Sequence, residues 1–87
     1  MDSFKIAVFV DGRQNNFLVD RIELPDVVYV VRSVDGDETF KPRKFYADKE
    51  NCTLRFPIDD SLDRQIASAI EHWCLTNQVS LIETLMK

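Results

Sequence analysis

The chain has 87 residues, of which 45% are hydrophobic, 10% are aromatic and only two are glycine. Such a chain is ordered but can bury only one core, so we expect a single small domain over residues 1–87. Its formal net charge of −4 argues against a general phosphate-binding protein, because nonspecific affinity for nucleic acid comes mainly from Lys and Arg side chains.

The sequence contains neither a signal-peptide pattern nor a membrane span. It does not open with a basic segment followed by an apolar one, and no apolar run approaches the roughly 20 residues that cross a bilayer. We therefore expect a soluble cytoplasmic protein that does not bind membranes.

The first 47 residues are expected to form four strands. Alternating apolar residues, or runs of β-branched residues, predict strands over residues 4–10, 17–24, 27–34 and 39–47. The polar stretch 11–16 predicts a turn, and Pro25 ends the second strand because proline fixes its own backbone. Asp35-Gly36 predicts a tight hairpin between the third and fourth strands.

The stretch 52–73 predicts a fifth strand followed by a helix. The apolar residues of the strand are Cys52, Leu54, Phe56 and Ile58. Asp59, Asp60 and Ser61 are favourable N-cap residues for the helix. Its apolar stripe consists of Leu62, Ile66, Ala69, Ile70 and Trp73. Asn77-Gln78 is expected to break this helix, and Ser80 with Glu83 forms a capping-box pattern that predicts a short terminal helix.

Five strand-like runs before the first long helix predict an α+β fold. We expect a mostly antiparallel, meander-like sheet of four or five strands, with the C-terminal amphipathic helix packed on one face and a short terminal helix beyond it. A four-residue loop between the last two strands would place Phe45 opposite Leu54, and Pro42 opposite Pro57 where the ladder ends.

The predicted register gives the sheet two unlike faces. The helix side receives the apolar set of the first strand with Leu18, Ile22, Leu24, Val28, Val30 and Val34. The opposite face receives Phe9, Phe17, Val19, Tyr29, Val31, Phe40 and Tyr46, among Lys5, Arg21, Lys44 and Arg55. That face is too apolar to meet only water, so we expect a partner, or the segment 79–86 of this or a neighbouring chain, to cover it.

Two details of this register are open to direct comparison with a structure. Asp20 should lie near Arg32 as a cross-strand charge pair. The register assumes a three-residue turn over 25–27, and a slip of one residue would exchange the residues of the second strand between the faces.

The cysteines and the histidine are expected to be structural. Cys52 and Cys74 do not form a CxxC motif, and His72 is the only histidine. This set does not make a standard zinc site, so buried thiols and a packed or hydrogen-bonded histidine are the expected roles. We predict neither a metal nor a cofactor.

The stretch Ile6–Phe17, IAVFVDGRQNNF, is an apolar strand that ends in Asp11 and continues into glycine and asparagine. It resembles the opening of NYN/PIN-like ribonuclease domains, which alternate strands and helices around a parallel sheet. The resemblance implies that Asp11 is a ligand of a divalent metal. It further implies site neighbours or oxygen ligands among Asn15, Asn16, Asp35, Asp59 and Asp60.

A basic cluster accompanies the aromatic residues of the predicted second face. It consists of Lys41, Arg43 and Lys44, with Arg55 across the ladder. Together with Tyr29, Phe40 and Tyr46, it resembles the sheet surfaces that stack single-stranded bases. The ribonucleoprotein sequences of RNA-recognition motifs are absent, and aromatic residues are also enriched at protein interfaces.

We predict a small non-catalytic protein-interaction module, a modulator or inhibitor that docks on a larger protein such as one that handles nucleic acid. Its partner is another protein or a second copy in a homodimer. The predicted partner-binding residues are Tyr29, Phe40, Lys44, Tyr46 and Arg55. An exposed acidic helix side with Asp63 and Glu71, and the hairpin tip at 35–38, would add to the surface. The alternatives are a single-stranded nucleic-acid binder and a metal-dependent nuclease with Asp11.

Overall fold

The computed structural model describes residues 2–23, 25–34, 40–56 and 61–83. Five strands precede one helix, in the order β1 (Asp2–Val10), β2 (Arg13–Ile22), β3 (Val28–Ser33), β4 (Arg43–Asp48), β5 (Thr53–Arg55) and α1 (Ser61–Thr76). The predicted α+β class, with an antiparallel sheet and a C-terminal helix, is confirmed.

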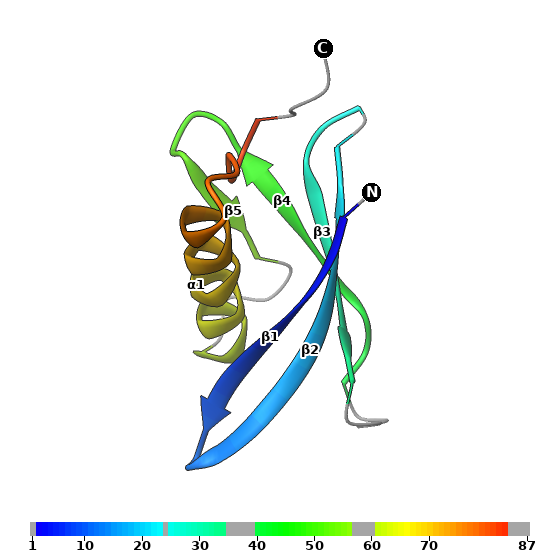
Figure 1. The fold of residues 1–87 in the computed structure, drawn as a ribbon, viewed down its shortest axis with the longest axis vertical. Helices are drawn as coiled ribbons and strands as arrows, with labels where there is room; N and C mark the ends of the chain where they lie inside the picture. The colour runs from blue at the N-terminus through cyan, green and yellow to red at the C-terminus, as the bar shows by residue number, and fades with distance from the viewer. Residues whose placement is uncertain (1, 24, 35–39, 57–60, 84–87) are drawn as a thin grey trace.

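The sheet is a meander in which every strand pairs with its neighbour in sequence. The strand order is β1-β2-β3-β4-β5, and all four pairings are antiparallel. The sheet curls into a half-barrel, and α1 lies within its concave side (Figure 1). β1 and β5 are therefore the two edges of the sheet.

The β1–β2 hairpin closes through a two-residue turn. Asp11 and Gly12 have φ angles of 52° and 74°, and Val10 pairs with Arg13 on either side of them. Two consecutive positive φ angles define a type I′ turn, whose twist matches that of the flanking strands. The predicted turn over 11–16 was therefore too long, because β2 already begins at Arg13.

The predicted faces of β2 and β3 were wrong. Val19 pairs with Val31, and Tyr29 pairs with Phe45, so the odd-numbered residues of both strands face the helix. A two-residue turn at 35–36 would have placed Val28 opposite Arg43, whereas Val28 lies opposite Tyr46. β3 and β4 are instead joined by the longer segment 34–42, and an odd shift in register exchanges the faces of a strand. Residues 35–39 lie outside the described part of the chain.

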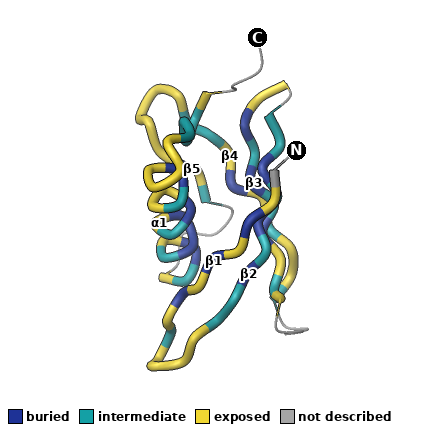
Figure 2. Tube along the Cα trace, in the orientation of Figure 1, coloured by how far each residue is buried: buried dark blue, intermediate teal, exposed yellow. Residues whose placement is uncertain are grey.

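The core lies between the concave face of the sheet and α1 (Figure 2). Its buried apolar side chains come from every strand and from the helix: Phe4, Ile6, Val8, Phe17, Val19, Val27, Tyr29, Val31, Phe45, Leu54, Ile66, Ala67, Ile70 and Cys74. Phe4 and Trp73 stack with ring centroids 3.7 Å apart, which joins β1 to the last turns of α1. The predicted apolar face of the first strand is confirmed.

The β4–β5 hairpin keeps its predicted faces but shifts by two residues. Leu54 lies opposite Ala47 rather than Phe45, and an even shift leaves the faces unchanged. Cys52 has a φ of 55° and lies exposed in the loop, so its predicted burial was wrong. Pro57 and Ile58 lie outside the described residues.

Helix α1 ends in a Schellman motif. Gln78 has a φ of 57°, the Val79 N–H donates to the Cys74 carbonyl at 2.9 Å, and the Gln78 N–H donates to the Leu75 carbonyl at 3.3 Å. These bonds satisfy carbonyl groups that a helix end leaves free. The predicted break at Asn77-Gln78 is confirmed. Asp59 and Asp60, predicted as caps, lie outside the described residues.

The described part of the C-terminal tail does not form the predicted helix. The Glu83 N–H donates to the Ser80 hydroxyl at 3.0 Å, which is one half of the expected capping box, but residues 79–83 have no helical backbone. The tail packs on the helix side of the sheet rather than on its second face, as its contacts with Arg21 and Tyr29 show. Leu85 and Met86 lie outside the described residues.

Candidate functional site

The outer face of the sheet, which is turned away from α1, combines aliphatic and basic side chains. Its aliphatic residues Leu18, Ile22, Val28 and Val30 are half-buried, and its cations Lys5, Arg32, Lys44 and Arg55 are exposed. Among the described residues, the exposed large hydrophobic side chains are Phe9, Val34, Tyr46 and Leu75. Strand alternation places all of these except Leu75 on the outer face.

The register brings the predicted residues Lys44, Tyr46 and Arg55 together on this face. Tyr46 lies between Val28 on β3 and Arg55 on β5 in one row across the strands. Lys44 lies opposite Val30 in the neighbouring row. The Tyr46 side chain is 49% exposed, so an aromatic ring stands between aliphatic and cationic neighbours where a partner can reach it.

The outer face has a positive balance although the chain is acidic overall. Its four cations are accompanied by two carboxylates, Asp20 and Asp48. Asp20 accepts hydrogen bonds from Ser3 at 2.6 Å and from Arg32 at 3.1 Å, which confirms the predicted pair. Lys44 forms no ion pair with any residue that the structure describes. This face therefore complements an acidic surface.

Asp48 organises the loop beside Arg55. Its carboxylate accepts hydrogen bonds from the Asn51 side chain at 2.9 Å and from the backbone N–H groups of Glu50 and Asn51. The Asn51 bonds, followed by the Glu50 bond and the Arg55 charge, hold the pKa of Asp48 below its ordinary value of 3.8. Asp48 is thus a loop anchor, and the Arg55 guanidinium lies 3.9 Å from it.

Two predicted partner-binding residues lie in or against the core instead of on the outer face. Tyr29 is completely buried. Phe40 packs against the core, with its ring centroid 4.8 Å from that of Phe17 and 4.5 Å below the Arg43 guanidinium. The prediction that both rings are exposed was wrong. The exchange of the β3 faces buries Tyr29, whereas Phe40 precedes β4 and packs on Phe17 of β2.

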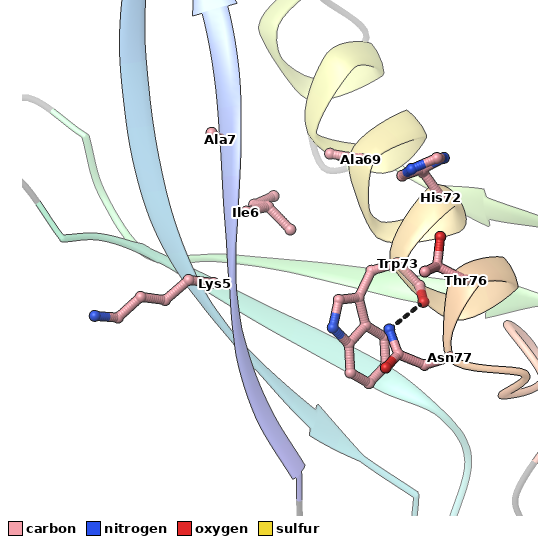
Figure 3. Close-up of a pocket in the computed structure, with 8 residues that line it drawn as sticks. All are labelled: Lys5, Ile6, Ala7, Ala69, His72, Trp73, Thr76 and Asn77. Atoms are coloured by element: carbon pink, nitrogen blue, oxygen red, sulfur yellow. Dashed lines mark hydrogen bonds between the residues drawn. The ribbon is translucent and has the colours of Figure 1, made fainter.

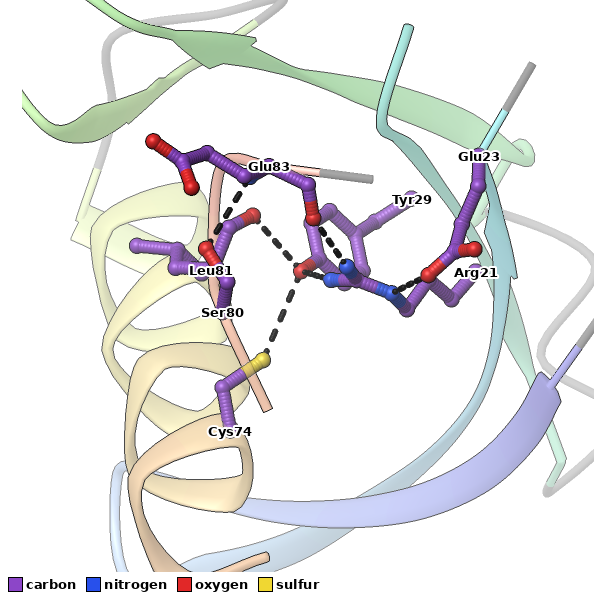
Figure 4. A network of polar contacts seen from close by, with 7 residues as sticks. All are labelled: Arg21, Glu23, Tyr29, Cys74, Ser80, Leu81 and Glu83. Carbon is purple, nitrogen blue, oxygen red and sulfur yellow. Dashed lines mark hydrogen bonds and ion pairs between the residues drawn. The ribbon is translucent and has the colours of Figure 1, made fainter. Parts of the chain in front are cut away.

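A buried polar cluster, absent from the sequence predictions, connects the sheet to the C-terminal tail (Figure 4). The Tyr29 hydroxyl donates to the Leu81 carbonyl at 2.8 Å and accepts from the buried Arg21 guanidinium. Arg21 also donates to the Glu83 carbonyl at 2.9 Å and pairs with Glu23 at 3.1 Å. Among the described residues, no buried side-chain polar atom lacks a partner.

The same cluster keeps Tyr29 protonated. Burial raises the pKa of Tyr29 well above its ordinary value, the Cys74 thiol raises it further, and the Arg21 guanidinium opposes both effects. The Cys74 sulfur lies 3.4 Å from the hydroxyl. Because the single hydroxyl hydrogen is directed to Leu81, the thiol is the donor in this contact. The arrangement is structural, since it is closed off from solvent by the tail.

Asp63 forms a second buried polar contact. It is fully buried in the first turn of α1 and pairs with Arg43 of β4. The prediction that Asp63 belongs to an exposed acidic helix side was wrong. Glu71 and His72 are exposed on α1, so Glu71 matches the prediction and His72 is not packed in the core.

A groove separates the free edge of β1 from α1 (Figure 3). Its hollow of about 280 Å³ has Ile6, Ala69 and Trp73 among its apolar walls, with Thr76 and Asn77 at one end. The Ile6 side chain points toward the helix and Lys5 points to the other side of the strand. The volume is just below the range of roughly 300–1,000 Å³ that small-molecule sites occupy.

The fold differs from the one implied by the resemblance to NYN/PIN-like ribonucleases. The sheet is antiparallel throughout, whereas the resemblance implies a parallel sheet. Asp11 is the first residue of the type I′ turn, a position that favours Asp and Asn. Asp35, Asp59 and Asp60 lie outside the described residues. The described residues contain no group of three or more His, Cys, Asp or Glu side chains arranged for a metal ion.

Comparisons with protein-family models, curated proteins and solved structures found no match for this chain. In the part of the chain that the structure describes, no helix is long and apolar enough to cross a membrane.

Proposed function

We propose that this chain is a non-catalytic protein-interaction module whose outer sheet face binds an acidic surface of a larger protein. The observation that supports this most is the composition of that face. It carries Phe9, Val34 and Tyr46 as exposed apolar side chains and four exposed cations, in a chain whose net charge is −4. Interfaces combine such aromatic anchors with complementary charge.

Tyr46 and the cations beside it give the outer face the side chains that a protein interface needs. Tyr46 presents a large, rigid ring with few rotatable bonds, which is the kind of side chain that anchors interfaces. Lys44 lies two residues before Tyr46 on the same side of β4, and Arg55 lies opposite Tyr46 through the β4–β5 pairing. We place the protein in the cytoplasm, since Cys52 and Cys74 are both free thiols and a reducing compartment keeps thiols free.

The test is affinity capture from the native source with three tagged chains. The unaltered chain should retain a partner, Lys44→Glu should lose it, and Lys41→Glu should retain it. Lys41 is exposed just before β4 and gives the same change of charge outside the strand rows that hold Lys44, Tyr46 and Arg55. Equal recovery of one partner by all three chains, or no partner with any of them, would remove the proposal.

Binding of single-stranded nucleic acid is a second candidate, supported by the exposed Tyr46 ring between Lys44 and Arg55. The burial of Tyr29 and the packing of Phe40 leave this part of the face with one stacking ring, whereas such binders usually stack successive bases on several rings. Fluorescence anisotropy with labelled oligothymidine at low salt separates the candidates. A nucleic-acid binder shows affinity that falls steeply with added salt, and no signal at low salt eliminates this function.

The partner of the outer face could also be a second copy of this chain, which would give a homodimer. Because both copies would present the same cations, such a contact would bring like charges together and be weak. A measured mass that doubles with concentration in the absence of any partner would favour it over a hetero-complex.

A further inference from the structure

The edge of β1 offers a row of backbone groups that the fold leaves without strand partners. The closing pair of a two-residue hairpin exchanges both of its hydrogen bonds, and bonded pairs then alternate along the strands. Because Val10 and Arg13 are the closing pair, the even-numbered residues of β1 bond to β2. The backbone N–H and C=O groups of Ser3, Lys5, Ala7 and Phe9 therefore point away from the sheet.

These outward groups stay open in the described part of the chain. No backbone hydrogen bond connects Ser3, Lys5, Ala7 or Phe9 to another described segment. β1 has nine residues, whereas the opposite edge strand, β5, has three. A long edge without proline is the kind that accepts a further strand.

Two neighbouring hollows separate this edge from α1 and together form the β1–α1 groove. One hollow runs along Lys5, Ile6 and Ala7, and a second runs along Ala7, Val8 and Phe9. Both hollows are bordered by Ala7 of β1 and by Ala69 and His72 of α1, so they are neighbours along the strand. Ile6 and Trp73 supply an apolar floor in the first hollow (Figure 3).

The charge of the groove limits what can enter it. Among the described residues that line the two hollows, Lys5 is the one fully charged residue, His72 is the one other titratable residue, and none is a carboxylate. Glu71, which is exposed on α1, borders neither hollow. In a chain with 15 acidic residues, this composition complements a segment that carries a carboxylate.

We propose that the β1–α1 groove binds an extended acidic peptide segment of another protein, which adds a sixth strand to the sheet. The backbone of the segment pairs with Ser3, Lys5, Ala7 and Phe9. Its alternate apolar side chains enter the groove over Ile6 and Trp73, and a carboxylate on its other side meets Lys5. This is recognition by strand addition, in which main-chain bonds supply affinity and alternate pockets supply specificity.

A second copy of this chain fits the groove less well. Two β1 strands paired antiparallel around Ile6 would place Lys5 opposite Ala7 of the other copy, and no carboxylate would face Lys5. The β1 edge shares Lys5 and Phe9 with the outer face, but Ala7 at the edge and Lys44 on the outer face can be altered independently, so the proposal is tested separately from the proposed function.

The experiment is selection from a displayed library of random nine-residue peptides on the intact chain, followed by titration of the enriched peptides as synthetic molecules. We expect peptides with apolar residues at alternate positions and at least one Asp or Glu. Ala7→Pro removes an outward N–H that β2 does not use, and should weaken binding by roughly threefold to tenfold, since one main-chain hydrogen bond is lost. Ala7→Thr keeps the N–H and should bind normally.

Two further measurements keep the test independent of any effect of proline on folding. Lys5→Glu should weaken the acidic peptides by about fivefold or more, as expected for an exposed charge pair turned repulsive. Methylation of the peptide amides that face β1 should abolish binding to the unaltered chain, whereas methylation of the alternate amides should not.

Lys44→Glu should bind the peptides as the unaltered chain does, because Lys44 does not line the groove. A failure of the outer-face proposal would therefore leave the peptide result unchanged. The groove proposal is overturned if no peptide is enriched, if Ala7→Pro binds the enriched peptides normally, or if both sets of methylated peptides bind alike. A concentration-dependent dimer that Ala7→Pro dissociates would show that the occupant is a second copy, which also overturns it.

Discussion

The Tyr29 hydroxyl on β3 donates a hydrogen bond to the Leu81 carbonyl at 2.8 Å across 52 positions of sequence. With the bond from Arg21 to the Glu83 carbonyl, this contact fixes the C-terminal tail over the end of the core. The tail thereby closes the concave side of the sheet beside α1. The described part of the tail does not cover the outer face of the sheet, which is turned away from α1.

Tyr29→Phe should therefore destabilise the fold and loosen the tail. The change keeps the ring but leaves the Leu81 carbonyl and one Arg21 donor without their partner, which costs about 1–3 kcal/mol. Urea unfolding measures the loss, and faster amide exchange at Val79 and Glu83 would locate it. Tyr46→Phe is the matched control, because removal of an exposed hydroxyl should change stability by less than about 0.5 kcal/mol. Equal effects of the two changes would contradict the role of the cluster.

Asp63→Ala should destabilise the chain by about 3 kcal/mol, because it leaves the Arg43 guanidinium beside the core without its carboxylate. The double variant Asp63→Leu with Arg43→Met should recover most of this loss, since apolar residues of similar size can replace a buried ion pair. Thermal unfolding of the single and double variants measures the coupling. Additive losses in the double variant would show that the two side chains act independently.

The first turn gives a prediction about two adjacent residues. Gly12→Ala should cost about 1 kcal/mol, because a side chain at a φ of 74° is strained even though no atom lies within 4 Å of the added carbon. Asp11→Asn should leave stability unchanged or raise it slightly, since Asn is favoured at this position of a type I′ turn. Chemical denaturation measures both, and a large loss with Asp11→Asn would show that the carboxylate has another role.

The acid dependence of stability should include a contribution from Asp48. Its folded pKa lies below the ordinary value of 3.8, so the unfolded chain binds this proton more readily. The stabilisation is present above pH 3.8 and is lost as the pH falls through the folded pKa. In Asp48→Asn, the fall in unfolding free energy below about pH 4 should be shallower than in the unaltered chain. Parallel curves from urea unfolding at several pH values would contradict this.

The main error in the sequence prediction came from two Asp-Gly pairs with different structural roles. Asp11-Gly12 forms the two-residue turn that fixes the β1–β2 register, but it was assigned to a longer turn. Asp35-Gly36 was assigned to a tight hairpin, whereas the pairing of Val28 with Tyr46 requires a longer connection. The local sequence favours a turn in both cases, and only the pairing of whole strands decides its length.

The strand and helix predictions succeeded where alternation was unambiguous, as in β1 with Phe4, Ile6 and Val8. The burial of Arg21 and Asp63 was not predicted, because the sequence analysis placed Arg21 on the face away from the helix and Asp63 on an exposed side of the helix. Arg21 shares the period of Phe17 and Val19, which indicates burial, and Asp63 lies one helical turn before Ile66 and Ala67. The Arg21 guanidinium bonds to Glu83, 62 positions away, and Asp63 pairs with Arg43, 20 positions away. Local sequence patterns do not report such contacts.

The mass of the captured complex tests the central claim most directly. The chain alone has a mass of 10.1 kDa. Light scattering on material captured with the unaltered chain should give a larger mass that includes an acidic partner, and material captured with Lys44→Glu should give 10.1 kDa. A mass of 10.1 kDa for the unaltered chain, or the same complex with Lys44→Glu, would contradict the assignment of the outer face as the binding surface.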